Sequence, residues 1–423
     1  MSKFVKSTTT RFIPGLSGRR RRLAFGLIGL LILIIVGSSL SAQYFLIQHN
    51  PSTHETNQIV GHAFFKSSGQ LNEGSSQGVN DQLQIELRGI PNPAAGKSYY
   101  AWLLGDSHKN VKENLCKPAE ELISLGRLFD NQGVVSFSYA GNQSHTNLIS
   151  CTSRLLITEE NTTSTPSQPS TNQHAWVYYA EIPQLPDPTD SVNHYSALDD
   201  IRHLLYEGPD LKNKGLHGGL DLQLLRNMQN VLEWAGSARD AWNGAKIGDI
   251  DFVHRQVVRI LDYLDGTYRP KGITVPLVQT DVPPGTPLLV DPNFALVPLL
   301  DLPRRNTSYM ARISRQLSGI STAPGVSVEM RTLAKQINSQ LLIVKGLLEK
   351  VYQDAKTLVS LPDSQLLQPS TLTILNDLET QANNIFVGRL DPTTGQVAQG
   401  VVQIHYSIQQ LATFDIKPFT SIL

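Results

Sequence analysis

Cysteine and charge are both scarce in this chain. Only two of its 423 residues are cysteine, which is too few for a zinc site built from four thiolates. Charged residues make up 17%, below the roughly 25% usual in soluble domains, and Lys plus Arg equals Asp plus Glu at 36 each. A chain without net charge lacks the basic surface by which proteins bind nucleic acid, so we expect no nucleic-acid partner.

Catalytic sequence motifs are missing as well. The GKS at 96–98 lacks the first glycine of a phosphate-binding loop, because that position is Pro91. No G-x-S-x-G occurs, so the HGG at 217–219 is interpreted as a turn that enters a helix rather than as part of an oxyanion site. The GDIDF at 248–252 does not have the ligand order of a calcium loop. We therefore assign no catalytic residue and no cofactor, and predict that the protein is not an enzyme.

One long apolar run is present. Four consecutive arginines, Arg19, Arg20, Arg21 and Arg22, stand directly before residues 23–47, which contain no charged side chain. A bilayer core roughly 30 Å thick is spanned by about 20 apolar residues in a helix, and flanking arginines stay on the cytoplasmic side. The run predicts a signal anchor in a bacterial plasma membrane, with the lipid bilayer as partner and the later residues extracytoplasmic. A cleaved signal peptide is the alternative, since small residues occur at 39–42.

The predicted topology places both cysteines outside the cell. Cys116 and Cys151 both fall in the part placed outside the cell, where oxidising conditions allow a disulfide to persist. Closing a loop of that size would stabilise the fold by roughly 3 to 4 kcal/mol. We predict that they pair; two separate buried thiols are the alternative.

Residues 59–183 have the pattern of β structure. In QLQIELRG, Leu83, Ile85 and Leu87 alternate with polar residues, which places one face on a core and the other in water. Six further short runs rich in Val, Ile, Phe, Tyr and Trp, separated by turn residues, complete about seven predicted strands. Turn signals at intervals near ten residues are typical of an Ig-like sandwich of two sheets. An exposed excursion is expected at 161–173, which has no apolar side chain.

The period becomes helical after the proline-containing linker at 183–190. Helices are expected within 196–206, 222–242, 251–266, 328–359, 371–388 and 397–414. In the long segment 328–359, the apolar spacing fits an internal core or, as the alternative, a coiled-coil interface between copies. The expected fold class is α+β multidomain: a transmembrane helix, then an all-β Ig-like sandwich, then an all-α helical bundle region. The predicted divisions are 1–22 cytoplasmic tail, 23–47 anchor, 55–183 sandwich, 190–268 helical hairpins, 269–303 proline-rich connector and 304–423 bundle.

Three histidines of the helical region could form a metal site. His203, His217 and His254 belong to the early helical hairpins, which a bundle can bring together, and Asp199 and Asp251 could orient two of the imidazoles. No H-x-x-x-H or H-x-x-E-H spacing occurs, so their convergence would depend wholly on tertiary packing. Surface or helix-capping histidines are the alternative interpretation.

Three segments of the β region carry a family resemblance. AGKSYYAWLLGD, ISLGRLFDNQGVVSFSY and RLLITEENTTSTPSQP resemble the extracytoplasmic C-terminal domain of anti-sigma-K factors. The matching positions are Gly96, Lys97, Tyr99 or Tyr100, Trp102, Ser124 to Gly126, Thr158 to Glu160 and Pro166. The resemblance covers roughly residues 60–183 and implies a β-sandwich linked to sigma-factor control. Members of that family carry a cytoplasmic helical domain before the membrane helix, whereas 22 residues precede it here, so we expect sigma-factor control only through another protein.

These observations favour one function over its alternative. We predict a non-enzymatic, single-pass membrane protein that senses the envelope state or binds an unknown protein partner. The alternative is an anchored or secreted metal-binding protein or envelope enzyme that uses the histidines of the helical domain.

Overall fold

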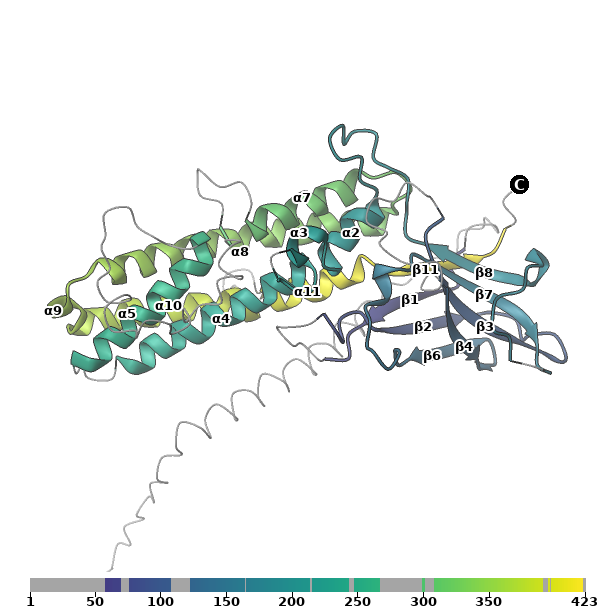
Figure 1. The fold of residues 1–423 in the computed structure, drawn as a ribbon, viewed down its shortest axis with the longest axis horizontal. Helices are drawn as coiled ribbons and strands as arrows, with labels where there is room; N and C mark the ends of the chain where they lie inside the picture. The colour runs from purple at the N-terminus through teal and green to yellow at the C-terminus, as the bar shows by residue number, and fades with distance from the viewer. Residues whose placement is uncertain are drawn as a thin grey trace, which may run out of the picture. The chain divides into compact units, whose positions relative to one another are not determined.

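A computed structural model describes residues 58–69, 76–107, 122–163, 165–213, 215–242, 247–266, 299–300, 308–390, 395 and 397–420. All of these belong to one compact unit, Glu55–Leu423. It contains a β-sheet and a group of long helices (Figure 1).

The main sheet has nine antiparallel strands in the order β4-β3-β7-β8-β11-β1-β2-β6-β5. Eight of them come early in the chain: β1 Gly61–Lys66, β2 Gln82–Arg88, β3 Lys97–Leu104, β4 Leu122–Leu128, β5 Asp130–Asn131, β6 Val134–Tyr139, β7 Arg154–Asn161 and β8 Trp176–Glu181. The ninth is β11, Phe414–Pro418. Only Phe129 separates β4 from β5, the two strands at opposite ends of the order, so the sheet is nearly closed.

The predicted two-sheet sandwich is wrong, and β11 is the reason. Without it, the strands would divide into β4-β3-β7-β8 and β1-β2-β6-β5. β11 pairs with β1 on one side, where Gly61 faces Ile416, and with β8 on the other, where Tyr179 faces Lys417. Its Phe414 and Ile416 are fully buried, so the same alternation that builds β2 also fixes the side on which β11 packs. A strand from the region predicted to be all-helical therefore joins the two halves into one sheet.

Helices make up most of the chain between β8 and β11. The described ones are α2 Ala197–Leu205, α3 Pro209–Lys212, α4 Leu220–Ala241, α5 Ile247–Leu261, α7 Tyr309–Thr322, α8 Val328–Ser360, α9 Asp363–Leu366, α10 Pro369–Val387 and α11 Val401–Gln410. Three short 3-10 or π segments also occur in the described ranges: η2 Leu148–Ser150, η3 Gln173–Ala175 and η4 Asp262–Gly266. A two-stranded hairpin, β9 Arg389–Leu390 with β10 Val397–Ala398, separates α10 from α11.

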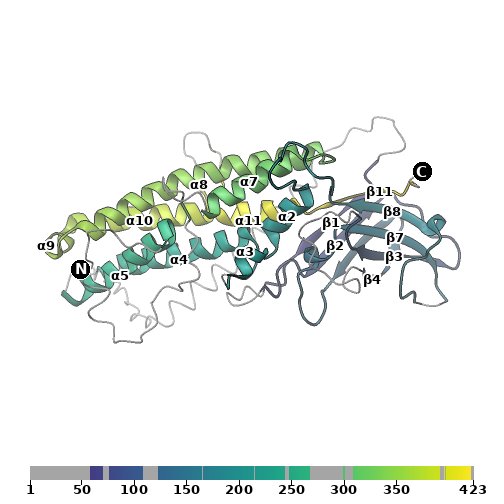
Figure 2. The same ribbon diagram turned by 45° about the horizontal axis from the view of Figure 1, so that its top comes forward.

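The long helices pack side by side around one core (Figures 1 and 2). In α8 the buried positions recur every three or four residues: Ala334, Ile337, Leu341, Val344, Leu348, Val351, Ala355 and Leu358. This stripe packs against α7, α10, α5 and α11 of the same chain, as the internal-core interpretation predicts. Side-chain caps fix where helices begin, since Ser308 and Ser327 accept hydrogen bonds from the first turns of α7 and α8.

The membrane predictions need correction. The residues on which they depend, Arg19, Arg20, Arg21 and Arg22 with the run 23–47, lie outside the described residues. Nowhere in the described ranges is a helix both long enough and apolar enough to cross a bilayer. The described helices that have the length are amphipathic; α8, for example, carries the exposed Glu349 and Lys350 between its buried positions. A single-pass membrane protein with a transmembrane helix and a plasma-membrane location is therefore not supported.

Candidate functional site

A groove between α7 and α8 encloses a cavity of about 340 Å³. Both walls are helical, and both contribute apolar and polar side chains. Its lining consists of Met310, Ala311, Ser314, Arg315 and Ser318 from α7, and Leu341, Leu342 and Lys345 from α8. Cavities of this size fit a small ligand or a few side chains of a partner.

The groove exists because α7 presents small side chains at helical spacing. Ala311, Ser314 and Ser318 recur at steps of three and four residues and so lie on one face of the helix. Both serines are held by local hydrogen bonds: the Ser314 hydroxyl donates to Asn338 Oδ1 of α8 over 2.7 Å, and the Ser318 hydroxyl donates to the Ser314 carbonyl over 2.8 Å. Larger side chains here would fill the space.

The groove is cationic and partly apolar. Arg315 is exposed and Lys345 is half-buried, and no carboxylate within the described ranges forms an ion pair with either. Leu342 is 60% exposed and its neighbour Ile343 is 46% exposed, so apolar surface continues beyond the cavity. Two cations that pair with no described carboxylate, beside exposed aliphatic side chains, are suited to an anionic, amphipathic ligand.

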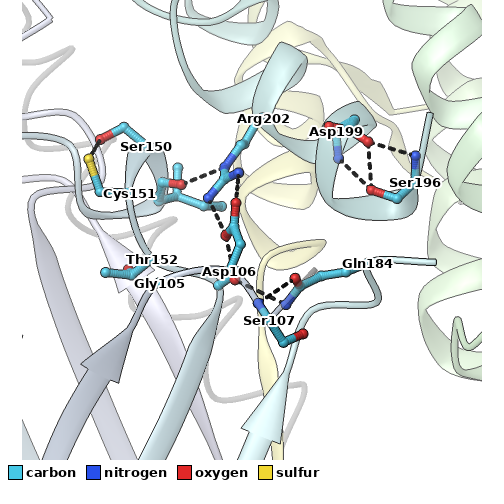
Figure 3. A network of polar contacts seen from close by, with 12 residues as sticks. Gly105, Asp106, Ser107, Ser150, Cys151, Thr152, Gln184, Ser196, Asp199 and Arg202 are labelled. Atoms are coloured by element: carbon cyan, nitrogen blue, oxygen red, sulfur yellow. Dashed lines mark hydrogen bonds and ion pairs between the residues drawn. The ribbon is translucent and has the colours of Figure 1, made fainter. Parts of the chain in front are cut away.

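A buried polar network joins the sheet to α2 (Figure 3). The Arg202 guanidinium, 1% exposed, donates to both carboxylate oxygens of Asp106 at 2.7 and 2.8 Å. Its Nε donates to the Ile149 carbonyl at 3.0 Å. Asp106 follows β3 and Ile149 belongs to η2, so one side chain connects three elements. A bidentate arginine–carboxylate pair of this kind fixes geometry as well as contributing energy.

The rest of this network is also satisfied by hydrogen bonds. Ser153 Oγ donates to Asp106 Oδ1 at 2.7 Å, and Gln184 Nε2 donates to Ser153 Oγ at 3.1 Å. Gln184 Oε1 accepts from the Ser107 backbone N–H at 2.8 Å (Figure 3). Because each group is engaged by another part of the fold, this network holds α2 against the sheet and presents no free atom to a substrate.

Helix α2 also carries two adjacent buried carboxyl groups, Asp199 and Asp200, and their surroundings differ. Asp199 forms a capping box with Ser196, accepting from its N–H and hydroxyl at 2.8 and 2.7 Å. Asp200 is 4% exposed, and no hydrogen bond from a described residue reaches its carboxyl group. Burial first, and then the carboxylates of Asp199, Asp190 and Asp187, raise the pKa of Asp200 to about 8.

The three histidines considered as metal ligands have separate surroundings. The ring of His203 packs on that of Tyr195 at 4.9 Å, and His217 Nδ1 lies 3.1 Å from a Glu207 oxygen. His254 is buried with neither ring nitrogen hydrogen-bonded, and burial lowers its pKa. Within the described ranges, no group of three or more His, Cys, Asp or Glu could hold a metal ion.

The predicted disulfide is described at one end only. Cys151 is disulfide-bonded, and Cys116, its predicted partner, lies outside the described residues.

Comparisons with family models, curated proteins and solved structures find no match to this chain. The candidate site is therefore defined by the geometry of this structure alone. That geometry includes the α7–α8 groove, whose cations Arg315 and Lys345 the sequence interpretation missed. The available signal was the spacing of small residues around Arg315 in α7, which becomes informative only once α8 is known to face it.

Proposed function

We propose that this protein is a non-enzymatic binding protein that holds an acidic, amphipathic segment of a partner protein in the α7–α8 groove. The observation that carries the proposal is the pair of cations, Arg315 and Lys345, without acidic partners among the described residues, on the rim of a partly apolar cavity. Acidic side chains of the partner would contact these cations, and its apolar side chains would cover Leu342.

A protein segment fits better than a small ligand because the apolar surface extends outside the cavity. Ile343 does not line the groove, yet it stands beside Leu342 and is 46% exposed. A small carboxylate confined to about 340 Å³ would leave this surface in water. An amphipathic helix laid along α8 would cover it, with anchors spaced at three and four residues.

Binding of a defined peptide tests the proposal. The probe is a fluorescein-labelled helical peptide with leucine on one face and glutamate on the other, and its matched control replaces every glutamate by lysine. Fluorescence anisotropy should show binding of the glutamate peptide alone, weakened by added salt. Reversing both cations, as Arg315→Glu with Lys345→Glu, should reduce affinity about tenfold or more, since exposed ion pairs contribute up to about 1 kcal/mol each.

Two variants separate the groove from general charge effects. Ser318→Leu adds bulk to the groove without changing charge and should also reduce the affinity. Lys350→Glu changes the charge of an exposed position on α8 outside the groove lining and should leave the affinity within about threefold, as expected for a screened distant charge. Equal binding of both peptides, or no effect of Ser318→Leu, would overturn the proposal. Binding of dodecanoate without the peptide would show instead that the groove takes a small amphipathic carboxylate.

The resemblance of residues 60–183 to the anti-sigma-K C-terminal domain stays a prediction. If it holds, the acidic partner would be a regulatory protein, and the chain would act in sigma-factor control through that protein rather than directly.

A further inference from the structure

The contact between Asp200 of α2 and Gly319 of α7 is unusually close. A methyl group on Gly319 would overlap the Asp200 carboxyl group, so only glycine allows this carboxyl to lie against α7. Thr322, three residues further on in α7, donates to Asp187 Oδ2 at 2.7 Å. The end of α7 therefore contacts both α2, which carries Asp200, and the segment before α2, which carries Asp187.

Three states are available to a carboxyl group in this position. An ionised group without hydrogen bonds would be strongly disfavoured by burial and by three neighbouring carboxylates. A bound metal would need further ligands, and within the described ranges no suitable group of three exists. A neutral, protonated carboxyl avoids both problems. A neutral carboxyl has no charge to desolvate, so the close packing on Gly319 suits the protonated form.

We propose that the Asp200–Gly319 contact is a proton switch that keeps α7 in place while Asp200 is protonated and disturbs the α7–α8 groove when the proton is lost. This rests on the proposed function of the groove. The chemical event is loss of one proton from the Asp200 carboxyl to solvent, which leaves a carboxylate on a buried surface. Moving α2 and α7 apart, or admitting water, would relieve this charge.

The Asp200–Gly319 contact lies next to the groove along α7. Gly319 directly follows Ser318 and lies one helical turn after Arg315, both of which line the groove. A shift or partial unwinding of α7 at Gly319 would therefore move a groove wall and one of its two cations. Lys345, on α8, would stay.

The other charged groups around α2 are accounted for. Asp199 on α2, together with Asp190 and Asp187 of the preceding segment, acts on Asp200. α7 presents the uncharged Gly319, and Arg202 is held by Asp106 and by η2. Helices α4 and α11, which also pack on α2, contribute Asp221 and His405, which pair with each other at 2.9 Å.

The test measures binding of the glutamate peptide between pH 6 and pH 9.5 for the intact protein and for Asp200→Asn. If only the protonated form binds, a pKa of about 8 reduces the apparent affinity about tenfold between pH 7 and pH 9. Asp200→Asn should bind at pH 9 as tightly as the unaltered protein binds at pH 7. Glu349→Gln, which removes an exposed carboxylate of α8 outside the groove lining, should keep the fall.

A second measurement does not require the peptide. Hydrogen exchange of the α7 amides, compared between the two proteins at equal pH so that intrinsic rates cancel, should be the same at pH 6 and faster in the unaltered protein at pH 9. Peptide binding that does not change with pH, or equal exchange at pH 9, overturns the switch and leaves the groove proposal intact. Loss of binding at every pH with the exchange difference present overturns the groove proposal alone.

Discussion

Replacing Asp200 by asparagine should remove a large part of the pH dependence of stability. The folded protein holds a proton on Asp200 up to about pH 8, whereas the unfolded chain releases it near the ordinary value of 3.8. Between these pH values the folded state binds more protons, so its stability falls as pH rises. Each pH unit corresponds to about 1.4 kcal/mol, which gives a loss of about 4 kcal/mol at pH 7 and about 6 kcal/mol above pH 8. The amide of the Asp200→Asn variant does not ionise in this range, so this loss should be absent from it.

Urea denaturation followed by tryptophan fluorescence measures this directly. The free energy of unfolding of Asp200→Asn minus that of the unaltered protein should increase by about 4 kcal/mol from pH 4 to pH 7, and then level off above pH 8. Taking the difference removes the contributions of all other titrating groups. A difference that stays constant from pH 4 to pH 9 would refute the reasoning, because it would place the pKa of Asp200 near its ordinary value.

Asp187 provides a control with the opposite sign. Hydrogen bonds from Thr189 and Thr322 lower its pKa, so its contribution to stability is present above the ordinary value and is lost as pH falls through the folded-state pKa. The difference between Asp187→Asn and the unaltered protein should therefore change on acidification below about pH 5. A second, smaller change is expected near pH 8, because loss of the Asp187 charge also lowers the pKa of Asp200.

Three other perturbations test the packing. Gly319→Ala should destabilise by about 1 to 3 kcal/mol through overpacking, and Asp200→Ala in the same chain should restore part of that loss in a double-mutant cycle measured by denaturation. Arg202→Ala should cost about 3 to 5 kcal/mol because it leaves the Asp106 carboxylate buried without its partner; a cost below about 1 kcal/mol would mean that water replaces the guanidinium. Ending the chain at Thr413 should abolish cooperative unfolding of the sheet as seen by near-UV circular dichroism, whereas a separate β domain would be unaffected.

Strands were predictable from sequence where apolar and polar residues alternate within the strand itself. Leu83, Ile85 and Leu87 alternate in sequence and are all fully buried on one side of β2. β11 has the same alternation, with Phe414 and Ile416 buried, but over only five residues. Its five residues follow α11 so closely that Phe414 was included in a predicted helix, and its two partners lie in strands that precede the helices. No periodicity within 397–418 indicates that pairing.

The candidate sites were hidden for the same reason. Asp200 has the position of an ordinary first-turn acidic residue, which stabilises a helix start. Its unusual pKa results from burial against Gly319, which lies in a helix far along the chain. The groove likewise needs α8 opposite the small side chains of α7. Sequence spacing indicated that α8 would have a core-facing stripe, but not which of its remaining residues would border an open cavity.

Strand β11 also determines whether two fragments of the chain stay associated after a break in the backbone. His62 of β1 and Asp415 of β11 are hydrogen-bonded although 353 positions separate them in sequence. A single break between α5 and α7 would therefore yield two fragments that share one sheet, with the later fragment supplying its central strand. Such fragments should stay associated in native conditions and come apart only on unfolding, which makes this protein a natural candidate for assembly from two separately produced halves.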